Sequence, residues 1–163
     1  TKDVNWETVL SATGSKPILL EDGDIFISTG DTTISRYSGE DGSQMWQEVL
    51  STGNAADHAL TPHGILVTTS GGRVQSIDPG SGEMNWLEVL HGNCSFASEN
   101  CQEQCVLVAS GEMLTTISAQ NGELSQWLVT PGGIAGSVRN TPGFVVAITG
   151  AGDVMLWRMM GIN

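Results

Sequence analysis

The residues with the clearest chemical potential are one histidine and three cysteines within residues 91–105. The set His91, Cys94, Cys101 and Cys105 contains the ligand types of a Cys3His zinc site. Their spacing, however, differs from the C-x2-C pairs of common zinc sites, and apolar residues follow Cys105. Three alternatives stay open: a disulfide of Cys94 with Cys101 or Cys105, free thiols, or a metal site. We favour the disulfide and predict no metal.

The same segment carries a formal acceptor site for N-glycosylation, since Asn93 begins the tripeptide Asn-Cys-Ser. Clustered cysteines and a glycosylation site are both typical of oxidising compartments. The chain begins with Thr1 in place of Met, which indicates a removed signal peptide or a piece of a longer chain. We therefore expect the lumen of the secretory pathway or the extracellular space.

The other reactive side chains form no recognisable metal-binding or catalytic motif. His58 and His63 lie at no metal-ligand spacing from each other or from His91. The acidic turns at 21–24 and 39–42 have too few carboxylates for a calcium loop, so solvated β-turns are expected there. Motifs for a serine nucleophile, a phosphate loop, a zinc protease and a dinucleotide site are absent from the sequence. We predict no catalytic residues.

The composition narrows the classes of protein that the sequence can belong to. With 163 residues, of which 39% are hydrophobic, the chain is large enough for one folded domain. Its 18 acidic and 6 basic residues give a net charge of −12, which opposes binding to the phosphates of nucleic acids and to anionic membranes. No apolar run approaches the roughly 18 residues of a membrane-spanning helix. We expect neither a nucleic-acid partner nor a membrane span.

The elements that must position these residues recur every 40 residues. Residues 17–50 and 57–90 align without a gap, and two further units follow at 94–130 and 136–160. Each unit contains short runs rich in β-branched residues, separated by turns with Gly, Asp or Pro. Four strands in about 40 residues are the signature of one propeller blade. The sequence therefore predicts an all-β fold, a β-propeller with about four blades of four strands each.

The phase of the repeat also assigns blade boundaries. The predicted blades are residues 11–50, 51–90, 91–130 and 131–163, the last completed by a strand at 4–10. Three forms of closure follow: a four-bladed ring within one chain, two chains that exchange strands in an eight-bladed ring, or a piece of a longer propeller. We favour the last two jointly. Some closure or partner surface is required, because uncovered blade faces would be large apolar patches.

The segment at 76–86, SIDPGSGEMNW, resembles the tryptophan-docking repeat of quinoprotein (PQQ)-like propellers, in which an Asp and a Ser-Gly or Thr-Gly pair precede a Trp. An indole on the outer strand can cover the neighbouring blade while its N–H reaches a backbone carbonyl, and a Gly supplies the positive φ of the turn. The residues assigned to this structural docking role are Trp6, Trp46, Asp78, Gly82, Trp86, Gly122 and Trp127.

The resemblance includes branches of different function. Membership of the dehydrogenase branch would imply a bound quinone, a vicinal cysteine pair, a calcium site and a catalytic Asp. The chain has no vicinal cysteines, and half a ring could not enclose the cofactor, so we predict no enzyme and no cofactor. Residues 58–90 also resemble the lumenal propeller of subunit 1 of the endoplasmic-reticulum membrane protein complex. Bacterial outer-membrane assembly lipoproteins have similar repeats, but no lipobox cysteine lies near Thr1.

These observations together predict a non-catalytic propeller module for protein–protein interaction and scaffolding, secreted or lumenal. Its expected partners are other protein chains, or a second copy that completes the ring. The alternative is a propeller formed as an eight-bladed homodimer that binds a small molecule or a carbohydrate in its channel, with His58 on a first strand near that channel.

Overall fold

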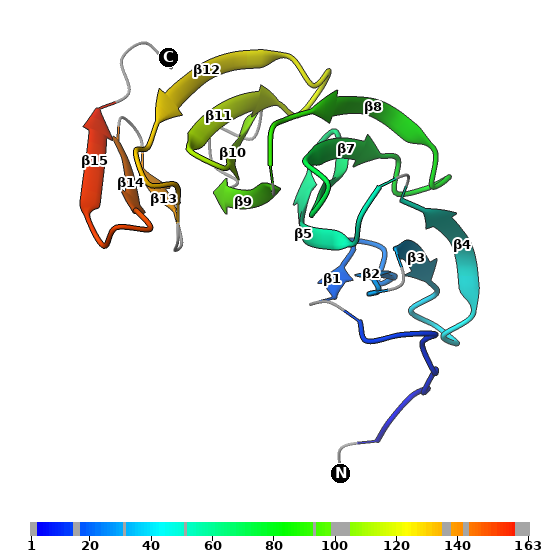
Figure 1. The fold of residues 1–163 in the computed structure, drawn as a ribbon. Coiled ribbons are helices and arrows are strands. Elements are labelled where there is room, and N and C mark those ends of the chain that lie inside the picture. The colour runs from blue at the N-terminus through cyan, green and yellow to red at the C-terminus, as the bar shows by residue number, and fades with distance from the viewer. Residues whose placement is uncertain are drawn as a thin grey trace.

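The structure is a computed structural model. It describes residues 3–14, 17–30, 32–50, 52–92, 94–98, 105–134, 138–141 and 144–158. Over these residues the regular secondary structure is β-strand, in four antiparallel sheets that follow one another along an open arc (Figure 1). The predicted all-β fold of about four propeller blades is confirmed.

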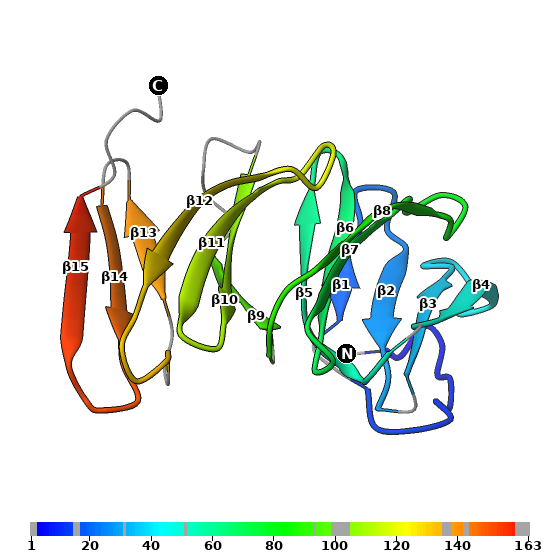
Figure 2. The same cartoon turned by 45° about the horizontal axis from the view of Figure 1, so that its top comes forward.

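The first two blades have four strands each, hydrogen-bonded in chain order. Blade 1 contains β1 (Ile18–Leu19), β2 (Ile25–Ser28), β3 (Thr33–Tyr37) and β4 (Gln44–Val49). Blade 2 contains β5 (Ala55–Thr61), β6 (Gly64–Thr69), β7 (Arg73–Ile77) and β8 (Met84–Val89). The first strand of each blade faces the inside of the arc and the fourth strand forms the outer rim (Figures 1 and 2).

The third blade repeats this order and the fourth is shorter. Blade 3 contains β9 (Cys94–Ser98), β10 (Cys105–Ser110), β11 (Met113–Ser118) and β12 (Leu124–Val129). Blade 4 contains β13 (Arg139–Thr141), β14 (Phe144–Ile148) and β15 (Val154–Arg158). No described strand pairs with the outer edge of β15.

Residues 4–10 do not complete blade 4 within this chain. They form no strand and lie beside blade 1, at the opposite end of the arc from β15 (Figure 1). The physical reason is the open arc itself, which separates its two ends, together with contacts of Trp6 on blade 1 that are described below. The four-bladed ring closed within one chain is therefore not the form that the structure has.

The hydrophobic core lies between blades rather than within them. Side chains alternate between the two faces of a strand, so each sheet gives one face to the preceding blade and the other to the following blade. Phe26 and Ile34 of blade 1 meet Ile65, Val67 and Ile77 of blade 2 in one buried cluster. Similar clusters join blade 2 to blade 3 and blade 3 to blade 4. A blade at the end of the arc consequently has one face without a partner.

Candidate interaction surfaces

Three tryptophans, two on outer strands and one in the segment before blade 1, contact the turns of the blade that follows. The indole N–H of Trp46 donates to the carbonyl of Pro79 at 3.0 Å, and that of Trp86 donates to Ala119 at 3.1 Å. The indole N–H of Trp6 donates to Gly39 at 2.9 Å. In all three cases the acceptor lies 33 residues after the tryptophan. The segment that carries Trp6 thus contacts blade 1 as β4 contacts blade 2.

A glycine lies beneath each of these indoles. Gly82 has a φ of +81°, and a Cβ built on it would lie 2.8 Å from Cδ2 of Trp46. Gly122 has a φ of +78°, and a Cβ added there would lie 2.7 Å from Cε3 of Trp86. Positive φ and the close ring both require glycine here. The glycine of each repeat therefore serves the tryptophan of the preceding repeat.

Asp78 organises the turn that presents Pro79. Its carboxylate accepts hydrogen bonds from the backbone N–H groups of Gly80 at 2.9 Å and Ser81 at 2.7 Å, and from the Ser81 hydroxyl. The Ser81 N–H is the largest influence that holds the pKa of Asp78 below its usual value. The side chain of Trp127 lies outside the described residues. In the backbone register Trp127 pairs with Thr115, one position away from the place that Trp86 has in β8.

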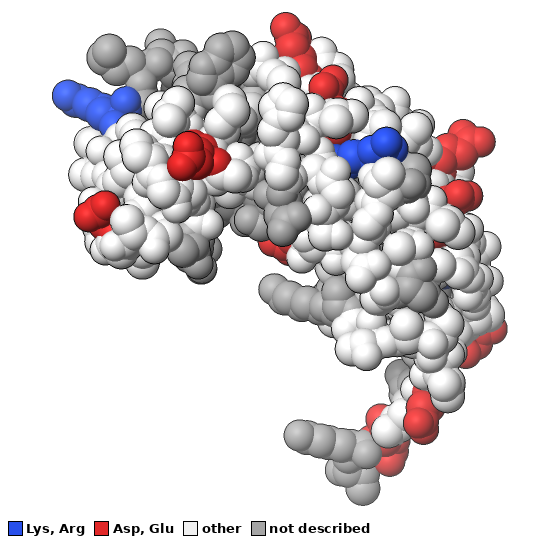
Figure 3. Space-filling view, in the orientation of Figure 1, with Lys and Arg blue, Asp and Glu red and all other residues white. Residues whose placement is uncertain are grey.

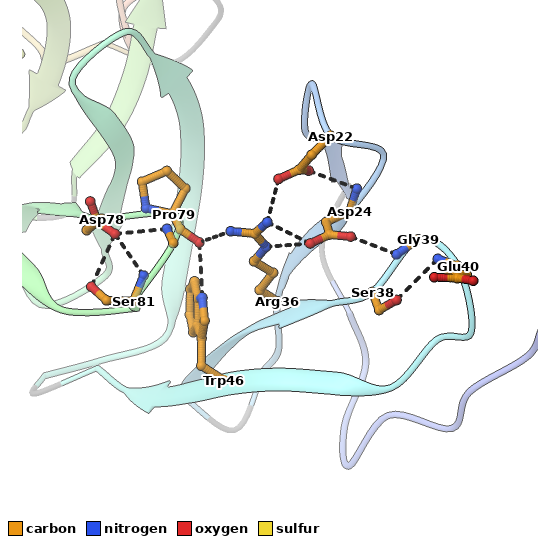
Figure 4. A network of polar contacts seen from close by, with 11 residues as sticks. Asp22, Asp24, Arg36, Ser38, Gly39, Glu40, Trp46, Asp78, Pro79 and Ser81 are labelled. Carbon is orange, nitrogen blue, oxygen red and sulfur yellow. Dashed lines mark hydrogen bonds and ion pairs between the residues drawn. The ribbon is translucent and has the colours of Figure 1, made fainter.

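The contact between blades 1 and 2 also contains a buried cation (Figure 4). Arg36 on β3 is 8% exposed and forms ion pairs with Asp22 and Asp24. Its Nε donates to Asp24 at 2.8 Å, and its Nη1 donates to the carbonyl of Pro79 at 2.6 Å. The same carbonyl accepts from Trp46. One backbone oxygen of blade 2 thus receives two donors from blade 1.

Sequence patterns alone did not predict this cluster. The sequence predicts a solvated turn at 21–24, but the Asp24 side chain is 14% exposed and lies against Arg36. A signal was present, because Arg36 alternates with the apolar Ile34 along one face of a strand. A cation on a core-facing position requires an anionic partner nearby.

The far face of blade 4 is exposed where the other blades are buried. We call this the exit face, defined by Val146 and Ile148 of β14 and Val154 and Leu156 of β15. Val154 is 71% exposed and Leu156 is 66% exposed. The positions equivalent to Val154, one per preceding blade, are all buried: Ile34, Val74 and Leu114. The exit face therefore carries residues of the kind that form the contacts between blades, but no described blade covers it.

The face of blade 1 at the other end of the arc is also incompletely covered. Ile25 and Ile27 of β2 are half-buried, whereas the equivalent Ile65 and Val67 of β6 are buried. We call the face that contains Ile25 and Ile27 the entry face. Residues 4–10 lie against blade 1 in the place of an outer strand, but no described sheet pairs with them. Each end of the described arc therefore has apolar side chains that are exposed or half-buried.

Comparison with known proteins identifies the family. No curated protein sequence matches the chain. A family model described as outer membrane protein assembly factor BamB, of the PQQ_2 type, matches residues 1–160. The chain belongs to this family. The resemblance to PQQ-like propeller repeats is thereby confirmed, and the resemblance to the endoplasmic-reticulum subunit stays a prediction.

Solved structures share the fold of this BamB-family chain. The computationally designed Ika4 protein has a TM-score of 0.81 at 12% identity, over 98% of this chain and 99% of that chain. BamB from Moraxella catarrhalis has a TM-score of 0.79 at 13% identity, over 95% of this chain and 49% of that chain. The WD40 propeller domain of Doa1 has a TM-score of 0.74 at 14% identity, over 93% and 53%. The chain spans about half the length of the latter two.

The structure of the BamB-family chain contradicts the favoured disulfide of Cys94. Cys94 is a buried free thiol in the cluster between blades 2 and 3, and burial raises its pKa. It donates to the carbonyl of Gly92 at 3.7 Å. The predicted disulfide of Cys94 is therefore wrong, because its side chain packs in the core. Cys105 is not among the free thiols. Cys101 and the predicted glycosylation site at Asn93 lie outside the described residues.

His58 packs against neighbouring side chains, whereas His63 is exposed to solvent. His58 of β5 lies edge-on to the ring of Phe26, and its Nδ1 is 3.4 Å from the Ser28 hydroxyl. It therefore packs at the contact of blades 1 and 2. His63 is exposed in the turn between β5 and β6. The described residues contain no group of three side chains that could hold a metal ion.

We expect the stability of this BamB-family chain to fall in acid because of Asp24. The backbone N–H of Gly39, at 2.9 Å, and the guanidinium of Arg36 hold the pKa of Asp24 below its usual value of 3.8. A lowered folded pKa stabilises the fold above the unfolded pKa, and this contribution is lost as the pH falls through the folded pKa. Thermal melting between pH 7 and pH 2.5, by circular dichroism, should show a shallower acid slope for Asp24→Asn.

The matched control is Asp3→Asn, because Asp3 is exposed near the N-terminus. Its acid slope should equal that of the unchanged chain. Equal slopes for all three proteins would contradict the assignment to Asp24.

Proposed function

We propose that this BamB-family chain is a non-catalytic β-propeller module that acts by binding other proteins. The observation that carries the proposal is the exit face of blade 4. Val154 and Leu156 are exposed at positions where every preceding blade buries its residues against a neighbour. Contiguous apolar surface of this kind marks a protein interaction site.

The geometry of the exit face supports a protein as the ligand. The outer edge of β15 is unpaired in the described structure, and an unpaired edge presents backbone N–H and C=O groups. Strand addition at such an edge combines backbone hydrogen bonds with side-chain contacts on the adjoining face. A polypeptide satisfies both requirements, whereas a small ligand would satisfy the apolar one alone.

Surface charge supports the same class of partner. The net charge is −12, and Figure 3 shows acidic side chains distributed along the arc with few basic ones between them. Phosphate backbones would be repelled by this surface. The four residues of the exit face are apolar. Arg158, at the end of β15, has its guanidinium 6.0 Å from the centre of the Phe144 ring.

The proposed location is an extracytoplasmic compartment, either the secretory lumen or the space outside the cell. The family description names an outer membrane assembly factor, which supports a location beyond the cytoplasm. Where the structure describes the chain, no helix could cross a membrane. N-glycosylation at Asn93 and a disulfide of Cys101 with Cys105 belong to this proposal.

The proposal is tested by a photo-crosslinking amino acid in place of Leu156, with the same amino acid in place of Val49 as control. Val49 is exposed on the outer rim, far from the exit face. We expect an adduct at position 156, identified by mass spectrometry in the extracytoplasmic fraction of the source cells, that the additional change Val154→Glu abolishes. Equal labelling at both positions, or none at position 156, would overturn the proposal.

A further inference from the structure

We infer that Asn121 is a site of covalent modification, at which the side-chain amide is lost as ammonia and the backbone before Gly122 can rearrange. The sequence contains a single Asn-Gly pair, and it lies at 121–122 in the turn between β11 and β12. A glycine after an asparagine leaves the backbone nitrogen unhindered, because glycine has no Cβ. This site lies within the arc, and it does not depend on the exit face or on a partner.

The reaction balances with water as its only co-reactant. The backbone nitrogen of Gly122 bonds to Cγ of Asn121 and gives up its proton. The bond from Cγ to Nδ2 breaks, and ammonia leaves with that proton, so that a succinimide ring remains. Water then opens the ring at one of its carbonyls. Opening on one side gives aspartate, and opening on the other gives isoaspartate, in which the main chain passes through Cβ and Cγ.

The two reacting groups lie in different surroundings. The side chain of Asn121 is exposed to water, whereas Gly122 is buried. The Gly122 N–H donates to the carbonyl of Ser118 at 3.0 Å, so the proton that must leave is held in a hydrogen bond. Oδ1 of Asn121 accepts from the backbone N–H of Glu123 at 3.1 Å, which fixes the side-chain amide. The folded turn therefore protects Asn121, and the reaction requires the turn to open.

Trp86 of β8 controls this opening, because it ties the turn to blade 2. Its indole N–H donates to the carbonyl of Ala119, in the same turn, at 3.1 Å. The ring lies directly on the backbone of Gly122, since a Cβ added there would be 2.7 Å from Cε3 of Trp86. The turn cannot open without separating from this ring. Protection of Asn121 is thus coupled to the contact between blades 2 and 3.

The two products should differ in their effect on the fold. A step of 40 residues places Asp41 of blade 1 at the position of Asn121. Asp41 accepts from the backbone N–H of Ser43 at 3.0 Å, as Asn121 accepts from Glu123. An aspartate therefore fits this turn. Isoaspartate adds a carbon to the main chain before Gly122, whose place beneath the ring leaves no room for a shift.

Peptide mapping by mass spectrometry tests the site. The folded chain is kept in mildly alkaline buffer, which favours loss of the Gly122 proton, and the change from amide to acid is followed at each asparagine. We expect aspartate and isoaspartate to accumulate faster at Asn121 than at Asn54, which is also exposed but precedes alanine. In the chain unfolded by urea, Asn121 should react about tenfold faster or more, since a tenfold change needs only about 1.4 kcal/mol of opening free energy. No excess over Asn54, or equal rates in the folded and unfolded chains, would overturn the inference.

Two variants of Trp86 test the protection. Trp86→Phe removes the hydrogen bond to Ala119, and Trp86→Ala also removes the ring. We expect the rate at Asn121 to rise in that order, to about tenfold above the unchanged chain for Trp86→Ala, which corresponds to about 1.4 kcal/mol. Trp86→Phe keeps the test valid if Trp86→Ala does not fold. The control Trp46→Phe makes the same change between blades 1 and 2 and should leave the rate at Asn121 unchanged. Equal rates in all these chains would overturn the role of Trp86.

Urea unfolding of the products tests the coupling to the fold. Asn121→Asp should unfold at the same urea concentration as the unchanged chain. Chains that carry isoaspartate at position 121, separated by chromatography after incubation, should unfold at a lower concentration. Equal midpoints for the isoaspartate chain and for Asn121→Asp would show that the blade contact tolerates the longer backbone, and would overturn the coupling.

Discussion

Trp86→Ala is expected to lower the free energy of unfolding by about 3 kcal/mol, near the low end for removal of a buried aromatic side chain. Trp86 is partly buried against the cluster of Leu66, Val106 and Ile117 that joins blades 2 and 3. Its indole N–H also satisfies the carbonyl of Ala119 at 3.1 Å. The loss is large because the change removes both the cover of an interface and a hydrogen bond.

Two variants divide this loss into its parts, with urea unfolding followed by circular dichroism as the measurement. Trp86→Phe keeps much of the apolar cover and removes the N–H, so it should cost about 1 kcal/mol. Trp6→Ala should cost less than Trp86→Ala, since Trp6 covers the end of the arc. Equal losses for Trp6→Ala and Trp86→Ala would contradict a role for Trp86 at the blade 2–3 contact.

Gly122→Ala examines the same contact from the other blade. The added Cβ would lie 2.7 Å from Cε3 of Trp86, and the backbone has a φ of +78° that disfavours alanine. The cost of Gly122→Ala should fall when Trp86 is already alanine, because the steric part of it is then absent. Full additivity of the two changes would show that the ring and the glycine are not coupled.

The blade architecture was predictable because its pattern of strands and turns occurs four times in the sequence. Strand-forming runs, glycine turns and the tryptophans at 46 and 86 recur at a fixed step, and each copy gives the same local answer. Repetition could not reveal which repeat a glycine serves. Gly82 and Trp86 are neighbours in one repeat, yet Gly82 lies under Trp46. Contacts between successive blades displace the pairing by one repeat.

Features that occur once were harder to predict. Arg36 occupies a position where the next two blades have Ser76 and Thr116, so the period carries no information about its partners. The cysteines near Cys94 in the sequence suggest a disulfide for it. The alternation of side chains along the strand instead places Cys94 in the core. Closure of the propeller ring depends on where the two ends of the arc lie. No local sequence pattern predicts those positions.

Arg36→Ala should lower the free energy of unfolding by about 3 kcal/mol, as expected when one partner of a buried ion pair is removed. The change leaves the carboxylate of Asp24 in a largely buried place without its cation. It also removes the 2.6 Å hydrogen bond to the carbonyl of Pro79, and with it a direct link from blade 1 to blade 2. Urea unfolding at pH 7 measures the loss.

A double-mutant cycle with Asp24→Asn tests whether the charge pair is the cause. The double variant should lose less stability than the sum of the two single variants, because the neutral side chain no longer needs a cation. Arg36→Lys should fall between the unchanged chain and Arg36→Ala, since an ammonium keeps the charge but cannot reach Asp22, Asp24 and Pro79 with a planar fork of donors. Additive single losses would show that Arg36 acts by packing alone, and the link between blades 1 and 2 would then rest on Trp46 and the apolar cluster.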